Sequence, residues 1–269
     1  MNPIPRKRFG QNFLHDPHVI DRIVAVIKAK PGQHMVEIGP GLGALTKPLL
    51  AILGDMDVIE IDRDLVGPLA ENLASVGTLR IHRQDALKSD LRTLANHFKL
   101  RVVGNLPYNI STPLLFHLID QLDVIEDMHF MLQKEVVDRM VAMPDTDDYG
   151  RLSVMVQYHC APVRLLNVGP GAFRPAPKVD SAVIRLQPHF IPPVSVANYP
   201  LFANIVNRAF MQRRKTLRNA LSGVATPEEM ESVEISPTAR GETLSLEKFA
   251  ALANVVNKVL GETSEVQPN

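Results

Sequence analysis

The residues best suited to chemistry stand at the ends of three β-branched runs, each typical of a buried strand. The first run leads into Glu37-Ile38-Gly39-Pro40-Gly41-Leu42-Gly43, the second ends at Glu60, and Asp85 follows the third. Glycines at a strand-to-helix turn permit positive φ and let a ligand approach the backbone. Carboxylates suit a ligand that is cationic or that presents hydroxyl and amino groups. The spacing therefore predicts a cofactor pocket with acidic walls.

Two cofactors are consistent with this glycine loop. Together with Ala44 the loop satisfies the dinucleotide pattern G-x-G-x-x-G/A, and Glu60 follows about 20 residues on, where a ribose-binding acid is expected. Glu37, however, would repel a pyrophosphate and attract the sulfonium cation of S-adenosylmethionine (SAM). Asp85 could meet the exocyclic amine of an adenine. The acids therefore favour SAM over a nicotinamide dinucleotide, and a glycine turn without a ligand would leave them unexplained.

A second set of candidate residues, Asn105-Leu106-Pro107-Tyr108, follows the fourth β-branched run. Ligands of open α/β sheets bind beyond the carboxyl ends of the strands, so this loop would share a cleft with the glycine loop. Asn105 and a backbone carbonyl directed by Pro107 could accept the N–H groups of an exocyclic amine and keep its lone pair available. Tyr108 offers a ring on which a flipped base can stack. The plainer interpretation is a proline turn with a hydrogen-bonded Asn105 and a half-buried Tyr108.

Methyl transfer from SAM to such an amine needs no acid or base with a shifted pKa. The methyl group leaves a sulfonium, its positive charge passes to the amine, and a proton is lost afterwards. Positioning and electrostatics would therefore supply most of the rate.

The pattern along residues 16–188 predicts the elements that hold these loops. Helical periods alternate there with β-branched runs, which is typical of an open sheet of parallel strands joined by right-handed crossovers. Expected strands begin at His34, Met56, Thr78, Leu100, Ile125 and Ser181. Expected helices begin at Asp16-Pro17 and near Ala44, Asp64, Ser89 and Ser111. The predicted fold class is therefore α/β.

Prolines gather within residues 188–200 and mark a linker, beyond which the sequence is typical of helices alone. One helix is expected over about 201–221, a second from Thr226-Pro227 with Glu229 in the capping-box position, and a third near Ser245. We expect a methyltransferase domain at 1–190 and a smaller all-helical domain at 191–269.

Charge is segregated along the chain, although its 29 basic and 29 acidic residues cancel. Zero net charge alone argues against a general nucleic-acid binder. Residues 1–15 nevertheless hold three basic and no acidic groups, 201–223 five basic and none acidic, and 224–247 one basic and six acidic. A phosphate responds to the local charge because the Debye length is about 8 Å at physiological salt. We predict RNA contacts, with a solvated helix face as the alternative, for Arg6, Lys7, Arg8, Arg208, Arg213, Arg214, Lys215 and Arg218.

The remaining composition excludes several classes of protein. Cys160 is the single cysteine, which rules out an internal disulfide and a thiolate zinc cluster and fits a reducing compartment. The N-terminus lacks the apolar stretch of a secretory signal, and residues 102–119 contain prolines and asparagines that would break a bilayer helix. The histidines show no metal-ligand spacing. We therefore expect a cytoplasmic protein with no metal and no membrane segment.

Five ordered motifs make the sequence resemble one family. They are KRFGQNFL (Lys7–Leu14), VEIGPGLG (Val36–Gly43), VIEID (Val58–Asp62), NLPYNIS (Asn105–Ser111) and FRPAPKVDSAV (Phe173–Val183). Over residues 5–260 the chain is similar to the ribosomal RNA adenine dimethyltransferases, in particular the bacterial KsgA/RsmA type. The resemblance implies a Rossmann-like SAM domain and a helical C-terminal domain that recognises RNA or the ribosome.

The resemblance also implies an activity. Two methyl groups would be transferred to the exocyclic N6 of each of two adjacent adenosines near the 3′ end of small-subunit (16S) rRNA. The enzyme would act as a monomer on a pre-30S particle during ribosome biogenesis.

The same resemblance assigns the cofactor site, which comprises Asn12, Leu14, Gly39, Glu60, Asp85 and Asn105. In that assignment Asn12 and Leu14 close over SAM, and Gly39 lies against its amino-acid portion. Glu60 holds the ribose hydroxyls and Asp85 binds the adenine amine.

The catalytic group that the resemblance implies comprises Asn105, Leu106, Pro107, Tyr108 and Phe173. Asn105 would touch both the cofactor and the target amine. Phe173 would stack on the flipped base opposite Tyr108.

Two alternatives remain open. The related erythromycin-resistance methyltransferases act on large-subunit rRNA, although the FRPAPKVDSAV segment and the basic C-terminal helix favour the small-subunit type. A non-catalytic assembly factor could use SAM only structurally, although it would not need an intact Asn105–Tyr108 loop.

Overall fold

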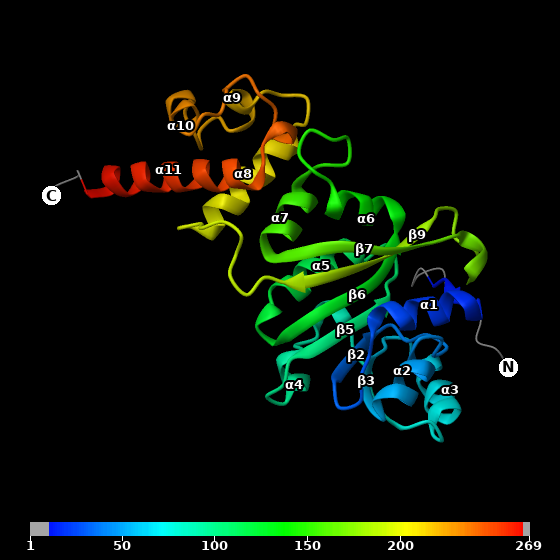
Figure 1. Ribbon diagram of the computed structural model, residues 1–269. Helices are drawn as coiled ribbons and strands as arrows, with labels where there is room; N and C mark the ends of the chain where they lie inside the picture. The colour runs from blue at the N-terminus through cyan, green and yellow to red at the C-terminus, as the bar shows by residue number, and fades with distance from the viewer. Residues whose placement is uncertain (1–10, 266–269) are drawn as a thin grey trace. The chain divides into compact units, whose positions relative to one another are not determined.

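A computed structural model describes residues 11–265 of the chain, which packs into two compact units (Figure 1). One unit contains the described residues up to Val137 together with Pro162–Pro188. The other contains Asp138–Ala161 together with the described residues from His189 onward. The predicted domain boundary at residue 190 therefore lies close to one of the observed boundaries. It leaves out Asp138–Ala161, which joins the C-terminal helices.

The first unit is built on a seven-stranded sheet in the order β4-β3-β2-β5-β6-β9-β7. The strands are β2 (His34–Ile38), β3 (Asp55–Ile59), β4 (Thr78–His82), β5 (Leu100–Asn105), β6 (Ile125–Gln133), β7 (Cys160–Val168) and β9 (Ser181–Pro188). β4, β3, β2, β5 and β6 are parallel, and β9 runs antiparallel to β6. The open α/β sheet and its six predicted strands are confirmed, but the expectation of parallel strands fails for β9.

β7 is a strand that the sequence did not predict. It lies at the edge of the sheet, carries Pro162, and lacks a regular alternation of buried and exposed residues. Proline is tolerated on an edge strand because a missing N–H there breaks no ladder on the outer side. The usual period-2 signal of a half-buried strand is therefore absent.

The helices of the first unit pack around its sheet. They are α1 (Pro17–Ile27), α2 (Thr46–Leu53), α3 (Arg63–Leu73), α4 (Arg92–Ala95), α5 (Ser111–Ile119) and the start of α6 (Lys134–Val141). Of these, α2, α3, α4 and α5 connect successive parallel strands. As predicted, the Asp16 side chain caps α1 by accepting from the amides of His18 and Val19, at 2.9 and 3.3 Å. The helix expected near Ser89 forms as two short pieces, the 3-10 turn Ala86–Lys88 and α4.

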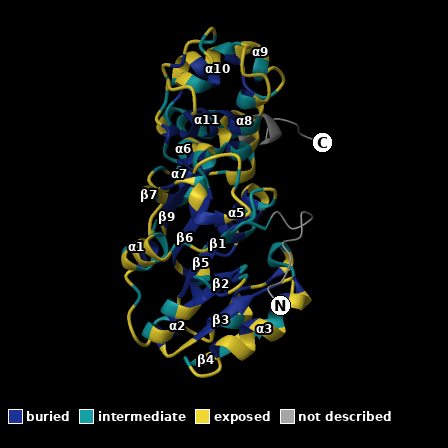
Figure 2. Ribbon diagram, turned by 90° about the vertical axis from the view of Figure 1, so that its right-hand side faces the viewer, coloured by how far each residue is buried: buried dark blue, intermediate teal, exposed yellow. Residues whose placement is uncertain are grey.

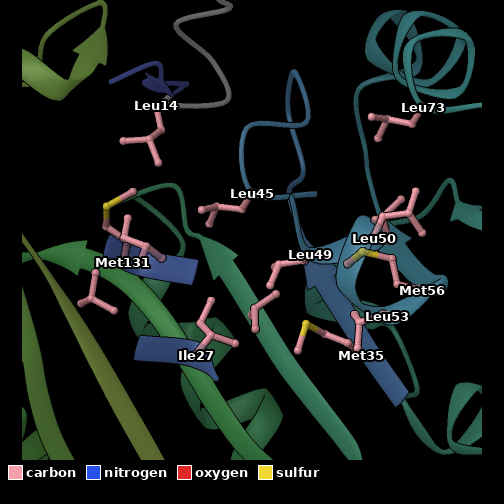
Figure 3. Close-up of a cluster of buried hydrophobic side chains, with 14 of the residues drawn as sticks. Leu14, Ile27, Met35, Leu45, Leu49, Leu50, Leu53, Met56, Leu73 and Met131 are labelled. Atoms are coloured by element: carbon pink, nitrogen blue, oxygen red, sulfur yellow. The ribbon is translucent and has the colours of Figure 1, made fainter. Parts of the chain in front are cut away.

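A large hydrophobic core forms between α1, α2 and one face of the sheet. Leu49, Leu50 and Leu53 of α2 point toward Met35 and Met56 of the neighbouring strands (Figure 3). All five side chains are at most 5% exposed. Buried residues also run along the central strands, dark blue in Figure 2. This core fixes the strands whose ends carry the candidate residues.

Arg101 is a buried charge that ties α1 to the sheet. Its guanidinium donates twice to the Asp127 carboxylate at 2.9 Å and also to the Ile27 carbonyl at the end of α1, at 2.7 Å. Gln33 Oε1 accepts a further bond at 2.8 Å. The bonds hold the pKa of Asp127 below its usual range despite burial, with His129 and Arg101 as the favourable partners. Removing either Arg101 or Asp127 would leave the other charge buried without its partner.

The second unit is helical. It contains α7 (Arg151–His159), α8 (Tyr199–Met211), α9 (Leu217–Ala220), α10 (Pro227–Ser232) and α11 (Leu246–Glu265). The ring of Tyr158 on α7 lies 5.7 Å from that of Tyr199 and 5.0 Å from that of Phe202, both on α8. This packing explains why Asp138–Ala161 belongs to the second unit. The capping box of Thr226 and Glu229 at the start of α10 is confirmed.

The single helix predicted over about 201–221 is wrong. α8 ends at Met211, and α9 begins only at Leu217. The amides of Leu217 and Arg218 donate to the carbonyls of Ala239 and Pro237, at 2.7 and 2.9 Å, rather than to the preceding turn of a helix. The basic residues between the two helices therefore lie in a turn.

None of the helices described in residues 11–265 combines the length and apolar character that crossing a bilayer requires.

Replacing Arg101 with methionine should lower the free energy of unfolding by about 3–5 kcal/mol, because the Asp127 carboxylate would lose its buried partner. The matched control is Arg92→Met, since Arg92 makes a similar two-pronged bond to Asp123 in solvent. Urea unfolding should separate the two variants clearly. Equal losses would contradict the structural role of the buried pair.

Candidate active site

A cavity of about 230 Å³ opens at the carboxyl ends of the parallel strands. Its walls come from residues 11–14, the glycine loop, the ends of β3 and β4, and residues 105–110. β2 pairs with β3 on one side and with β5 on the other, so the order of the strands reverses at β2. Open α/β sheets have a ligand-binding crevice at such a point. The predicted convergence of the glycine loop and the Asn105–Tyr108 loop is confirmed.

The glycine loop has the backbone that only glycine adopts without strain. Gly39, Gly41 and Gly43 have φ values of 68°, 57° and 85°. A Cβ on Gly41 would lie 3.1 Å from the ring of Phe13. The N-terminal strand therefore packs directly over the loop.

Glu37 is a nearly inaccessible carboxylate at the base of the cavity, with 2% of its surface exposed. Burial raises its pKa to about 7, and the charge of Glu60 acts in the same direction. The Thr46 hydroxyl opposes the shift by donating to Glu37 Oε2 at 2.6 Å. Glu37 therefore exchanges a proton near neutral pH, and a cation in the cavity would favour its ionised form.

Glu60 lies beside the glycine loop and is held by backbone amides. It accepts from the amide of Asp62 at 2.8 Å and from that of Gly41 at 3.4 Å. Burial nevertheless raises the pKa of Glu60. Asp62 accepts from the Asp64 amide and caps α3, and it also accepts from the Gln11 side chain at 3.2 Å.

Asp85 lines the same cavity from the end of β4. Its carboxylate accepts from the Leu87 amide at 3.0 Å, and it caps the 3-10 turn that follows. The three acids therefore face one space, as their spacing predicts. Thr46 and Phe13 are members of the site that sequence reasoning missed, and no spacing rule pointed to either.

Asn105 joins the two halves of the cavity. Its amide nitrogen donates to the backbone carbonyl of Asn12 at 3.0 Å. The hydrogen-bond network thus fixes which way the amide faces, and within the described residues its oxygen accepts no hydrogen bond and can meet a ligand. Asn12, Leu14, Leu106 and Pro107 also line the cavity.

Of the two aromatic residues expected to stack on a base, Tyr108 lines the cavity and Phe173 does not. Tyr108 lines the cavity and is half-buried, and its hydroxyl lies 2.7 Å from that of Ser181. Phe173 is 2% exposed, belongs to the hydrophobic core and does not line the cavity. Phe173 lies in β8 (Phe173–Arg174), where it pairs with Leu14 of β1 (Phe13–Leu14). In this arrangement no face of the Phe173 ring is open to a base.

The predicted RNA-binding residues of the second unit have unequal surroundings. All five are exposed, but Arg213 pairs with Glu242 at 3.1 Å and donates to the Asp147 carbonyl, and Arg208 donates to the Ser222 carbonyl. The side chains of Arg214 and Lys215 form no hydrogen bond or ion pair within the described chain. Arg213 therefore holds the turn between α8 and α9, and Arg214 and Lys215 remain available. Arg6, Lys7 and Arg8 lie outside the described residues.

Residues 4–258 match the model of the family described as ribosomal RNA adenine dimethylase. The chain belongs to this family. It is 56% identical to the ribosomal RNA small subunit methyltransferase A of Methylococcus capsulatus, over 96% of this chain and all of that protein. The corresponding protein of Pseudomonas aeruginosa is 54% identical, over 95% of this chain and 96% of that protein. These values place the whole described cavity within the part of the chain that the adenine dimethylase family shares.

Solved structures of related enzymes have the same fold. A dimethyladenosine transferase from Plasmodium falciparum superposes with a TM-score of 0.77 and 25% identity, over 91% of this chain and 98% of that one. The 23S rRNA methyltransferase ErmE superposes with a TM-score of 0.72 and 24% identity, over 91% of this chain and all of that one. Adenine dimethylases and a 23S rRNA enzyme therefore share the architecture, so the fold alone does not select the RNA.

Glu37→Gln should make stability less dependent on pH. The folded protein keeps the Glu37 proton up to about pH 7, whereas the unfolded chain releases it near the ordinary value of 4.5. The wild type therefore loses stability as pH rises through this window, and the variant does not. Between pH 5 and pH 8 the variant should gain about 2 kcal/mol relative to the wild type.

Urea unfolding of both proteins at the two pH values measures this difference. The gain should be absent in Glu71→Gln, which removes an exposed carboxylate of α3. A constant difference between Glu37→Gln and the wild type across the pH range would contradict the shifted pKa.

Proposed function

We propose that this chain is a SAM-dependent dimethyltransferase that modifies the N6 of two adjacent adenosines near the 3′ end of small-subunit rRNA. The observation that carries the proposal is the fixed amide of Asn105, whose nitrogen is bonded to Asn12 and whose oxygen is left to accept an N–H. The family assignment supports the reaction. The relatives at 54–56% identity, named small subunit methyltransferases, support the choice of rRNA.

The cavity suits SAM. When bound, SAM supplies an activated methyl group on a positively charged sulfur. Glu37 and Glu60 are buried carboxylates, and within the described chain no lysine or arginine pairs with either. Glu60 and Asp85 would hold the ribose and adenine, and Gly39, Asn12 and Leu14 would enclose the remaining parts. Among residues 11–265 no cluster of three histidine, cysteine or acidic side chains is arranged to hold a metal ion.

Asn105 and Leu106 would prepare the target amine. The Asn105 oxygen accepts one N–H, and the Leu106 carbonyl, which has no hydrogen-bond donor in the described chain, accepts the other. These bonds would hold the nitrogen in a pyramidal geometry with its lone pair toward the methyl group. Most of the rate acceleration would then come from positioning the amine. Tyr108 would stack on the flipped base.

The same two acceptors account for two transfers. After the first transfer and the loss of a proton the amine would keep one N–H. Once the spent cofactor has been exchanged for a second SAM, the amine would rotate and present its lone pair again. After the second transfer no N–H remains for Asn105 or Leu106, and the product leaves. Stacking by Phe173 on the base would require this ring to become uncovered.

The proposal is tested by incubating the protein with methyl-labelled SAM and unmethylated small subunits, and then mapping nucleosides by mass spectrometry. Two adjacent N6,N6-dimethyladenosines near the 3′ end are expected. Methylation of a large-subunit adenosine instead, or no transfer to either subunit, would overturn the proposal.

We further propose that the protein acts in the cytoplasm as a monomer on a pre-30S particle. Free rRNA offered in parallel tests the choice of particle.

Asn105→Ala should lower kcat by about 10²- to 10³-fold, because the target amine loses a preorganised acceptor. Single-turnover transfer measures the effect. The matched control is Asn109→Ala, which changes an exposed asparagine of the same cavity wall and should keep most of the activity. Undiminished transfer by a folded Asn105→Ala protein would contradict the assignment.

Arg214→Glu should weaken binding to small-subunit particles about tenfold and reduce the slope of log K against log salt by about 1, because one phosphate contact is lost. Lys258→Glu is the control, since it gives the same change of charge on α11. The assignment of Arg214 to the RNA surface fails if the two variants bind alike across a salt series.

A further inference from the structure

We infer that Ser181 is a positioning residue that holds the Tyr108 ring ready to stack on the flipped adenine. The inference rests on the proposed function and deepens it. No sequence pattern connects the two residues, which lie 73 positions apart. Their hydroxyl oxygens are nevertheless 2.7 Å apart.

The topology of the sheet explains how Ser181 reaches the site. β9 runs antiparallel to β6, so its first residue lies at the edge where the parallel strands end. Ser181 opens β9 and pairs with Gln133, the last residue of β6. Tyr108 follows β5, the parallel neighbour of β6. Because β9 is antiparallel, its first residue places the Ser181 hydroxyl at the edge of the sheet where the parallel strands have their carboxyl ends.

The chemistry of the two groups suits a fixed orientation. Ser181 is fully buried, so water does not compete for its hydroxyl. Burial raises the pKa of Tyr108, which keeps the phenol protonated and able to donate a hydrogen bond. The Ser111 hydroxyl donates to the Tyr108 carbonyl at 3.1 Å and pins the backbone separately. Ser181 therefore acts on the ring alone.

A fixed ring would lower the entropy lost when the base stacks. The Ser181 contact should therefore affect the RNA step and leave the cofactor step unchanged. Removing one such hydrogen bond should lower kcat/KM for RNA about three- to tenfold. The KM for SAM should not change, because neither Ser181 nor its hydroxyl lines the cofactor walls.

The test is a double-mutant cycle in methyl transfer to unmethylated small subunits. Ser181→Ala and Tyr108→Phe should each lower kcat/KM for RNA by the expected amount, and the double variant should lose no more than either single variant. Ser111→Ala is the control, because its effect passes through the backbone and should be the same with and without Tyr108→Phe. SAM affinity, measured by calorimetry, should be the same in Ser181→Ala as in the wild type, because Ser181 does not line the cavity.

Two outcomes would overturn the inference. One is an additive loss in the double variant, which would mean that Ser181 supports the fold rather than the ring. The other is wild-type activity in both single variants, which would mean that the hydroxyl contact does not matter. An inactive wild type would instead count against the proposed function, so the two failures are distinguishable.

Discussion

The site depends on two carboxylates, those of Glu37 and Glu60, that the fold buries away from water. Glu37 and Glu60 are 2% and 5% exposed, and within the described chain neither forms an ion pair with a basic side chain. An ionised carboxylate in such a place loses hydration that Thr46 and the Gly41 and Asp62 amides replace only in part. The raised pKa values of both acids express this cost. A ligand with a positive charge and hydroxyl groups lowers this cost of burial. The parallel sheet places both acids at the cavity and so favours a cationic cofactor.

Elements with a strong local signal could be predicted from the sequence. β2–β6, β9, the cap of α1 and the capping box of α10 are encoded within a few residues, and the structure has them all. β7 was missed because an edge strand with a proline lacks regular alternation. The break between α8 and α9 was missed because it depends on the carbonyls of Ala239 and Pro237, which are remote in sequence.

Site residues follow the same rule. Glu37, Glu60 and Asp85 could be placed together because parallel strands end at one edge of a sheet. The contacts of Glu37 with Thr46 and of Tyr108 with Ser181 are tertiary, and neither spacing nor composition reveals them. Phe173 was assigned through the family motif alone, and its burial beside Leu14 became visible only in the folded chain. Charge counts likewise could not separate Arg213, which pairs with Glu242, from Arg214.

Calorimetric titration of the purified protein with SAM, and separately with NAD, tests the central claim most directly. The account predicts that SAM binds and that NAD does not. At pH 6.5 SAM binding should also release a proton, detected as a dependence of the heat on the buffer, because a cation favours ionised Glu37. Binding of NAD, or SAM binding without proton release, would contradict the claim that buried carboxylates select a cationic cofactor.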